Sequence, residues 1–165
     1  MKKVIIMTVL ISSSLVSFTT DAKKKNDSSY EAATRIVAAF QKSSSFEYSE
    51  LIPSIHELHG LMKENEALYG PYLQDAGQEM TNDYVNNFLP AIDKSFDAVI
   101  EEGIKRGIEW SKIQFVSFET DASESQSPSY FTVVISSNGK HHSIRIDNAF
   151  FVHGQFRANQ HIKLI

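Results

Sequence analysis

Two histidines three residues apart form the pattern in this chain that comes nearest to a metal site. They are His56 and His59, with Glu57 directly after the first. The zinc-protease motif needs its histidines four positions apart, so that both rings leave one helix face and the glutamate serves as base. Residues at i and i+3 can also share a face, but solvated or capping histidines near a helix start fit the same spacing. We therefore expect no bound metal, and His56 and His59 are the residues that would hold one.

A second group of polar residues alternates along two predicted strands. Its members are Tyr130, Thr132, Arg145 and Asp147. In a sheet curved around a cavity they could line a pocket and orient a small ligand; on a solvent-facing sheet they would form a cross-strand polar cluster. If the domain is catalytic, His142 and Asp147 are the candidate residues. The adjacent His141 and His142 point to opposite faces of a strand and cannot share one metal.

No other catalytic motif is present. The chain has no nucleophile elbow, phosphate-binding loop or dinucleotide fingerprint, and we expect no cofactor. The absence of cysteine excludes disulfides, thiolate ligands and a cysteine nucleophile. Carboxylates used as acid and base need unlike environments. Glu101 with Glu102, and Glu64 with Glu66, lie on predicted helix surfaces near lysines, and we interpret them as solvated.

The residues around Asn138 and Gly139 predict a hairpin that would position the polar group. This dipeptide suits a two-residue type I′ turn, and the segments 130–136 and 140–147 alternate apolar and polar residues. A slip of one residue would put every core side chain in water, so the register is well determined. The predicted pairs are Ile135 with His142, Val133 with Ile144, Phe131 with Ile146, Tyr130 with Asp147, Thr132 with Arg145, Val134 with Ser143 and Ser136 with His141.

Further short strands are expected at 113–119, 149–152 and 161–164, with a turn at His153 and Gly154. Phenylalanine is frequent in this half of the chain, at positions 115, 118, 131, 150, 151 and 156. One core face needs fewer aromatic side chains than this. Some of them are therefore candidates for an exposed surface that binds a partner.

Helical periodicity dominates before Trp110, which we expect to fill the core where the last helix meets the sheet. Capping boxes are predicted at Ser28 to Glu31 and at Ser54 to Glu57. The expected helices begin at residues 28, 46, 54, 72 and 90, the second of them a short segment, and Gly107 ends the last one. Helices followed by meandering strands indicate an α+β fold, with about four N-terminal helices packed on a four- to five-stranded antiparallel sheet.

The first 22 residues have the composition of a cleavable signal peptide. Lys2 and Lys3 precede the apolar stretch 4–16, and Thr20 and Ala22 offer small residues at the positions that a signal peptidase reads. That stretch is shorter than the roughly 20 apolar residues that span a bilayer, which favours cleavage over a retained anchor. We expect a flexible lead-in at 23–27 and a single domain at 28–165, free in the periplasm or the medium.

The charge of the chain bears on its partners. The leader carries two lysines and one aspartate, so its removal takes the formal charge from −4 to −5. A mildly acidic protein is a poor ligand for nucleic acid or anionic lipid. We therefore expect a protein or small-molecule partner, no nucleic acid and no membrane anchor after cleavage.

The order of elements resembles the cystatin-like and nuclear-transport-factor-2-like architecture. The segment 107–113 (GIEWSKI), followed by the hairpin at 137–140 (SNGK), also looks like small uncharacterised exported bacterial proteins of that shape. The resemblance implies a pocket between sheet and helices. It does not carry function across, because that architecture hosts enzymes, ligand binders and interaction modules, and no catalytic residue is carried over because the chain has no matching motif.

Two functions follow as expectations. The first is an exported, non-catalytic module that binds a protein or small ligand through the sheet or the cavity beside it. The alternative is a small hydrolase or isomerase that uses His142 and Asp147 in the cavity. A general base must reach its proton within hydrogen-bonding distance, so the placement of His142 distinguishes the two.

Cleavage of the leader is open to direct measurement. We expect the exported protein to begin at Lys23, because Ala22 is the last small residue of the leader. N-terminal sequencing and the intact mass of the protein recovered outside the cytoplasm check this. A bulky substitution, Ala22→Phe, should block or shift the cleavage, and an unprocessed wild-type chain would contradict the prediction.

Overall fold

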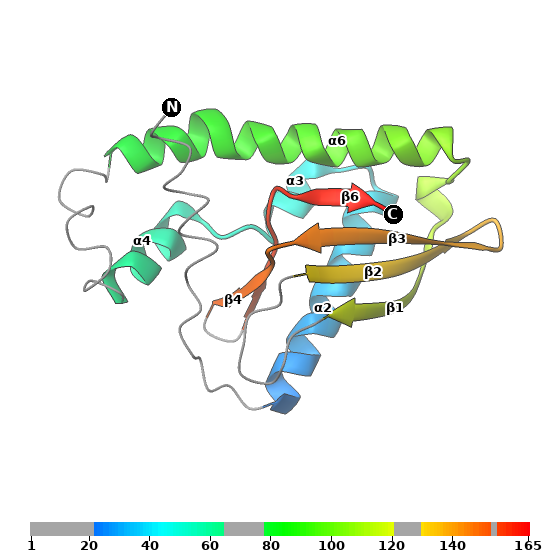
Figure 1. Cartoon of the computed structure of the whole chain (residues 1–165), viewed down its shortest axis with the longest axis horizontal. Helices are drawn as coiled ribbons and strands as arrows, with labels where there is room; N and C mark the ends of the chain where they lie inside the picture. The colour runs from blue at the N-terminus through cyan, green and yellow to red at the C-terminus, as the bar shows by residue number, and fades with distance from the viewer. Residues whose placement is uncertain (1–21, 65–77, 121–129, 153–154) are drawn as a thin grey trace.

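The helices precede the strands along the described chain, in the α+β order that the change of hydrophobic period predicts. A computed structural model describes residues 22–64, 78–120, 130–152 and 155–165. The helices with assigned bounds are α2 (Ala22–Gln41), α3 (Ser45–Ser49), α4 (Ile55–Glu64) and α6 (Leu89–Lys105), with the short turns η1 (Tyr84–Phe88) and η2 (Trp110–Lys112). The strands are β1 (Gln114–Thr120), β2 (Tyr130–Ser137), β3 (Lys140–Asp147), β4 (Phe150–Val152), β5 (Gln155–Arg157) and β6 (Ile162–Leu164). Figure 1 shows α2 crossing behind the sheet and α6 lying along β6, which it contacts.

The main sheet has four antiparallel strands in the order β1-β2-β3-β6. The hairpin of β2 and β3 has every strand pair that the sequence predicts. Asn138 and Gly139 adopt φ angles of 51° and 75°, and two central residues at positive φ are what a type I′ turn requires. Phe131, Val133, Ile135, Ile144 and Ile146 are all fully buried on the face that was predicted to be apolar.

The strand near residue 150 does not join this sheet. β4 pairs instead with β5, which places Phe151 opposite Phe156 in a separate two-stranded sheet. Asn148 adopts a φ of 56° directly after β3, so the chain turns away from the main sheet at this point. The strand β5 was not predicted, and the predicted turn at 153–154 lies outside the described residues.

Helix α2 begins earlier than its predicted start. Its backbone is helical from Ala22, so residues 23–27, expected as a lead-in, continue the helix. The capping box expected at Ser28 is therefore wrong. The Ser28 hydroxyl oxygen accepts a hydrogen bond from the backbone N–H of Phe156 at 3.0 Å, a partner that only the folded chain brings near.

The helices expected on either side of Pro90 are continuous where they are described. The chain is helical from residue 78 to Lys105, with the wider π-turn η1 directly before α6. In a regular α-helix the Pro90 ring would press on the carbonyl of the residue four positions earlier. The wider turn, in which the Leu89 N–H donates to the Tyr84 carbonyl, lets the helix pass this proline. The part of the expected third helix before residue 78 lies outside the described residues.

Trp110 fills the junction of α6, η2 and α2, as the sequence predicts. Its ring is stacked on Phe40 with centroids 5.0 Å apart, and its Nε1–H donates to the Ile100 carbonyl at 3.0 Å. Gly107, at φ 78°, ends α6: its N–H and that of Ile108 donate to Ile104 and Gly103 carbonyls in the pattern of a Schellman cap. This cap returns the chain to the sheet with Trp110 facing inward.

Gly103 gives the Trp110 ring its space. A Cβ atom added at Gly103 would lie 2.1 Å from Cζ2 of Trp110. No such approach exists in a packed core, so one of the two elements would have to shift. By contrast, a Cβ at Gly60 in α4 has no neighbour within 4 Å.

The substitution Gly103→Ala should therefore lower the free energy of unfolding by about 2 kcal/mol, because overpacking outweighs the better helix propensity of alanine. Gly60→Ala should raise it by about 0.5–1 kcal/mol. Urea denaturation followed by circular dichroism measures both. Equal effects of the two substitutions would show that Trp110 is not held against Gly103.

Candidate functional site

A capping box at the start of α4 supports one wall of the site from outside the cleft. The Glu57 N–H donates to the Ser54 hydroxyl at 3.2 Å, and the Ser54 N–H donates to the Glu57 carboxylate at 2.8 Å. This is the reciprocal arrangement that the spacing of these residues predicts. The start of α4 therefore holds the Glu57 side chain in place through local contacts alone.

Arg157 of β5 binds the same carboxylate from 100 residues away. Its Nε donates to Glu57 Oε1 at 3.0 Å and its Nη2 donates to the same oxygen, while Nη2 also donates to the Gln155 side-chain oxygen at 3.0 Å. The side chains of Arg157 and Glu57 are only 15% and 28% exposed. Burial alone would raise the pKa of Glu57. The hydrogen bonds from Arg157 and Ser54, together with the charge of Arg157, hold that pKa below its usual value.

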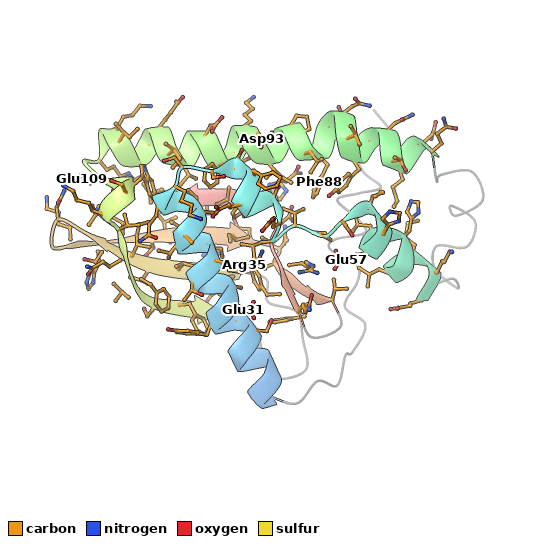
Figure 2. The ribbon with its side chains drawn as sticks, turned by 180° about the vertical axis from the view of Figure 1, so that it is seen from behind. Glu31, Arg35, Glu57, Phe88, Asp93 and Glu109 are labelled. Carbon is orange, nitrogen blue, oxygen red and sulfur yellow. The ribbon has the colours of Figure 1, made fainter. Side chains whose placement is uncertain are left out.

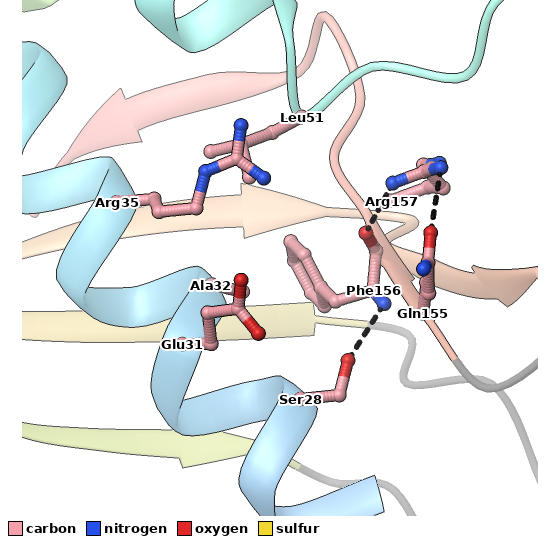
Figure 3. Close-up of a pocket in the computed structure, with 8 residues that line it drawn as sticks. All are labelled: Ser28, Glu31, Ala32, Arg35, Leu51, Gln155, Phe156 and Arg157. Atoms are coloured by element: carbon pink, nitrogen blue, oxygen red, sulfur yellow. Dashed lines mark hydrogen bonds between the residues drawn. The ribbon is translucent and has the colours of Figure 1, made fainter.

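The opposite wall is the middle of α2, from Ser28 to Arg35, with β5 attached to it through the bond between Ser28 and the Phe156 N–H. The Phe156 ring is buried and lies 4.5 Å from the Phe131 ring of the main sheet, measured between centroids. Between α2 and β5 lies a cleft of about 90 Å³. Its lining residues, drawn in Figure 3, are Ser28, Glu31, Ala32, Arg35, Leu51, Gln155, Phe156 and Arg157.

The charges on the α2 side of the cleft are incompletely paired. Glu31 and Arg35 lie one turn apart on α2 (Figure 2), yet Arg35 turns its Nη2 to Glu50 at 3.2 Å. Within the described residues, the Glu31 carboxylate has no hydrogen-bond or ion-pair partner. Ala32, Leu51 and Phe156 form an apolar floor and are at most 3% exposed. The cleft thus combines a free carboxylate and a partly used guanidinium with a buried apolar surface.

The four polar residues predicted on the hairpin do lie together, and the charged ones among them are paired within the sheet. The Arg145 guanidinium stands 4.4 Å from the centre of the Tyr130 ring, and its Nε donates to Asp147 at 2.7 Å. Lys163 of β6, which the sequence did not single out, donates to Asp147 at 2.6 Å. Burial would raise the pKa of Asp147, and these two cations hold it below its usual value. Thr132 is 6% exposed. Of the two alternatives, a pocket lining or a cross-strand polar cluster, these residues form the cluster, and none of them lines the cleft.

His142 and Asp147 are not brought together. They are five positions apart on β3, so they project from opposite faces of the strand and their backbones are about 16 Å apart at 3.3 Å per residue. Partial burial, with the nearby charge of Arg106, lowers the pKa of His142. Neither residue lines the cleft between α2 and β5.

The remaining histidine pair gains no third ligand among the described residues. His56 is exposed, and Nε2 of His59 is buried with no hydrogen-bond partner in that part of the chain. The intervening Glu57 is committed to Arg157. The described ranges contain no group of three side chains that could together hold a metal ion.

The described phenylalanines of the sheets do not form an exposed surface. Phe131, Phe151 and Phe156 are buried, and Phe115 and Phe118 are half-buried against the core. Their number is explained by two sheets rather than one: the Phe131 ring contacts both Phe118 of β1 and Phe156 of β5. Sequence reasoning missed the cleft for a related reason, because β5 is too short to show a period. The alternation of Gln155, Phe156 and Arg157 was the one local signal.

Comparison with protein-family models, with curated proteins and with solved structures finds no match to this chain. The resemblance to cystatin-like and nuclear-transport-factor-2-like proteins stays a prediction. None of the described helices combines the length and apolar character needed to cross a bilayer.

The pKa of Glu57 makes stability depend on pH with a defined sign. A carboxyl whose pKa is lowered by folding contributes stability above its unfolded pKa of about 4.5, and this contribution is lost as the pH falls through the folded value. We expect Glu57→Gln to unfold at lower urea concentration than wild type at pH 7, with a difference of about 1 kcal/mol.

The difference between wild type and Glu57→Gln should shrink as the pH is lowered below 4.5, because wild type then becomes neutral at this position too. Urea titrations between pH 3 and pH 7 measure it. Glu101→Gln, at an exposed site on α6, is the matched control and should leave the pH profile unchanged. A pH-independent difference for Glu57→Gln would mean that its charge does not hold β5.

Proposed function

We propose that this protein is an exported, non-catalytic module that binds a small polar ligand in the cleft between α2 and β5. The observation that carries the proposal is the free Glu31 carboxylate beside Arg35, above the apolar floor of Phe156 (Figure 3). Binding sites combine an apolar lining with a few polar groups that orient the ligand. A surface ion pair would satisfy its charges internally, as the cluster around Asp147 does.

The walls of the cleft are fastened on both sides, which supports a preformed site. The Ala158 N–H donates to the Leu51 carbonyl at 2.8 Å, and Ser28 and Glu57 hold the two residues before it, Phe156 and Arg157 of β5. A site that is already ordered loses little conformational entropy when it binds. Because both walls are already ordered, a ligand that makes few contacts can still bind.

Binding rather than catalysis is supported by the separation of His142 from Asp147 on opposite faces of β3. Export is supported by the leader, with its two lysines, apolar stretch and small residues before the cleavage position. The size of the cleft bounds the ligand: about 90 Å³ is far below the roughly 300–1,000 Å³ of sites for drug-sized molecules. The ligand is therefore a molecule of few atoms, or the end group of a larger one.

An NMR titration of the purified protein tests this proposal. The probe is a mixture of free amino acids, short carboxylic acids, primary amines and monosaccharides. We expect the backbone signals of Ser28, Ala32 and Phe156 to shift, because these residues line the cleft. The signals of Arg145 and Asp147 should stay in place and serve as the internal control.

Two results would overturn the proposal. One is the absence of any shift at the cleft, or shifts confined to Arg145 and Asp147. The other is conversion of a component of the mixture, which the ligand signals in the same tubes would reveal. A conversion that is lost in His142→Gln would instead support the hydrolase or isomerase.

A further inference from the structure

We propose that the ligand of the cleft is a small zwitterion, a free α-amino acid of few atoms. In this arrangement its ammonium group binds the Glu31 carboxylate and its carboxylate binds the Arg35 guanidinium. The inference rests on the proposed function, because it assigns the chemistry of the ligand for the same cleft.

The Glu31 carboxylate is available to bind a cation. Glutamate four residues before arginine on a helix is the favourable order for a direct ion pair, and Glu31 and Arg35 have this order. Arg35 instead contacts Glu50, and Glu31 stays unpaired among the described residues. A carboxylate on the wall of a cleft, with an apolar floor beside it, is a binding group for a cation that can form hydrogen bonds.

The remaining donors of Arg35 are available to bind an anion. A guanidinium carries five N–H groups, and Arg35 uses Nη2 in its contact with Glu50. That pair is 41% and 54% exposed, so water screens it and it binds Arg35 only weakly. The other N–H groups of Arg35 can donate hydrogen bonds to a carboxylate. Side chains at i and i+4 lie about 6 Å apart at their Cβ atoms, so one short molecule can reach both groups.

The balance of charge around the cleft distinguishes a zwitterion from an ion of one sign. Arg157 is neutralised by Glu57, and Arg35 is paired with Glu50. Among the described residues, Glu31 then leaves an excess of one negative charge, which repels a simple anion. A simple amine satisfies Glu31 but leaves the free donors of Arg35 without an acceptor in the filled cleft. An amino acid satisfies both groups with charge-assisted hydrogen bonds.

The volume sets the size of the amino acid. About 90 Å³ is well below the roughly 300 Å³ at which sites for drug-sized ligands begin, so the cleft suits an amino acid of few atoms. In glycine and alanine both charged groups are present on the smallest frame, and the methyl group of alanine would lie against Phe156 and Leu51.

Calorimetric titration of the purified protein with single compounds tests the inference. The probes are four single compounds. Glycine presents both charges and L-alanine adds a methyl group to them. Ethylamine presents the ammonium group alone and propionate the carboxylate alone. We expect glycine and L-alanine to bind at least tenfold more tightly than ethylamine or propionate. Each lost charge-assisted hydrogen bond of about 1.5–3 kcal/mol corresponds to a factor of roughly ten or more.

Two pairs of variants assign the contacts. Glu31→Gln should weaken L-alanine binding at least tenfold and leave the weak binding of propionate unchanged or tighter, while Glu101→Gln on α6 should change neither. Arg35→Gln should weaken L-alanine binding in the same way. Its matched control is Arg106→Gln, since Arg106 is also 41% exposed and pairs with a surface glutamate. An NMR spectrum of each variant that differs from wild type only near the substitution shows that the fold is intact.

The outcomes separate this inference from the proposed function. Binding of ethylamine or propionate as tight as that of L-alanine, or full L-alanine binding by Glu31→Gln, overturns the zwitterion while the cleft remains a binding site. No binding of the four probes, with cleft shifts from another component of the mixture, does the same. If no compound of the mixture shifts the cleft signals, both fail.

Discussion

The burial of the Phe40 ring is the constraint on which most of this structure depends. Phe40 has no exposed surface, and its ring centroid lies 4.4 Å from that of Phe96 and 5.0 Å from that of Trp110, with Tyr48 on a further side. These residues belong to α2, α6, η2 and α3, so four elements meet at one aromatic cluster. A helix is a rigid rod that rises 1.5 Å per residue. With its C-terminal end held at Phe40, α2 carries Ser28 about 18 Å away, alongside β5.

The C-terminal segment is attached to the rest by polar contacts as well as by the Phe156 ring. The fully buried Tyr48 hydroxyl donates to the Asn159 carbonyl at 3.0 Å, and burial raises its pKa far above the usual value. Together with the bonds from Ala158 to Leu51 and from Arg157 to Glu57, this contact fastens residues 157–159 to α3, to α4 and to the connection between them. Buried polar groups are costly unless they are paired. These contacts therefore specify one position of β5, and with it the shape of the cleft.

The two groups of charged residues show how the same side-chain types take different roles. On the mixed face of the main sheet, Asp147 accepts hydrogen bonds from Arg145 and Lys163, so both cations and the anion are satisfied within the sheet. At the cleft, Arg35 pairs with Glu50 rather than with its helical neighbour, and Glu31 has no partner in the part of the chain that the structure describes. The pairing partner, rather than the residue type, separates a structural cluster from a surface with free binding capacity.

The sequence by itself determined the features whose partners lie close along the chain. The hairpin register follows from Asn138 and Gly139 with the alternation on either side, and the capping box of Ser54 and Glu57 spans three residues. The tertiary structure alone decided the rest. Ser28 and Glu31 have the spacing of a capping box, but the partner of the Ser28 hydroxyl is a backbone N–H 128 residues away. A strand of three residues such as β5 is too short to show a hydrophobic period. The cleft is formed by such distant contacts, since packing around Phe40 and the ion pair of Arg157 with Glu57 bring its walls together.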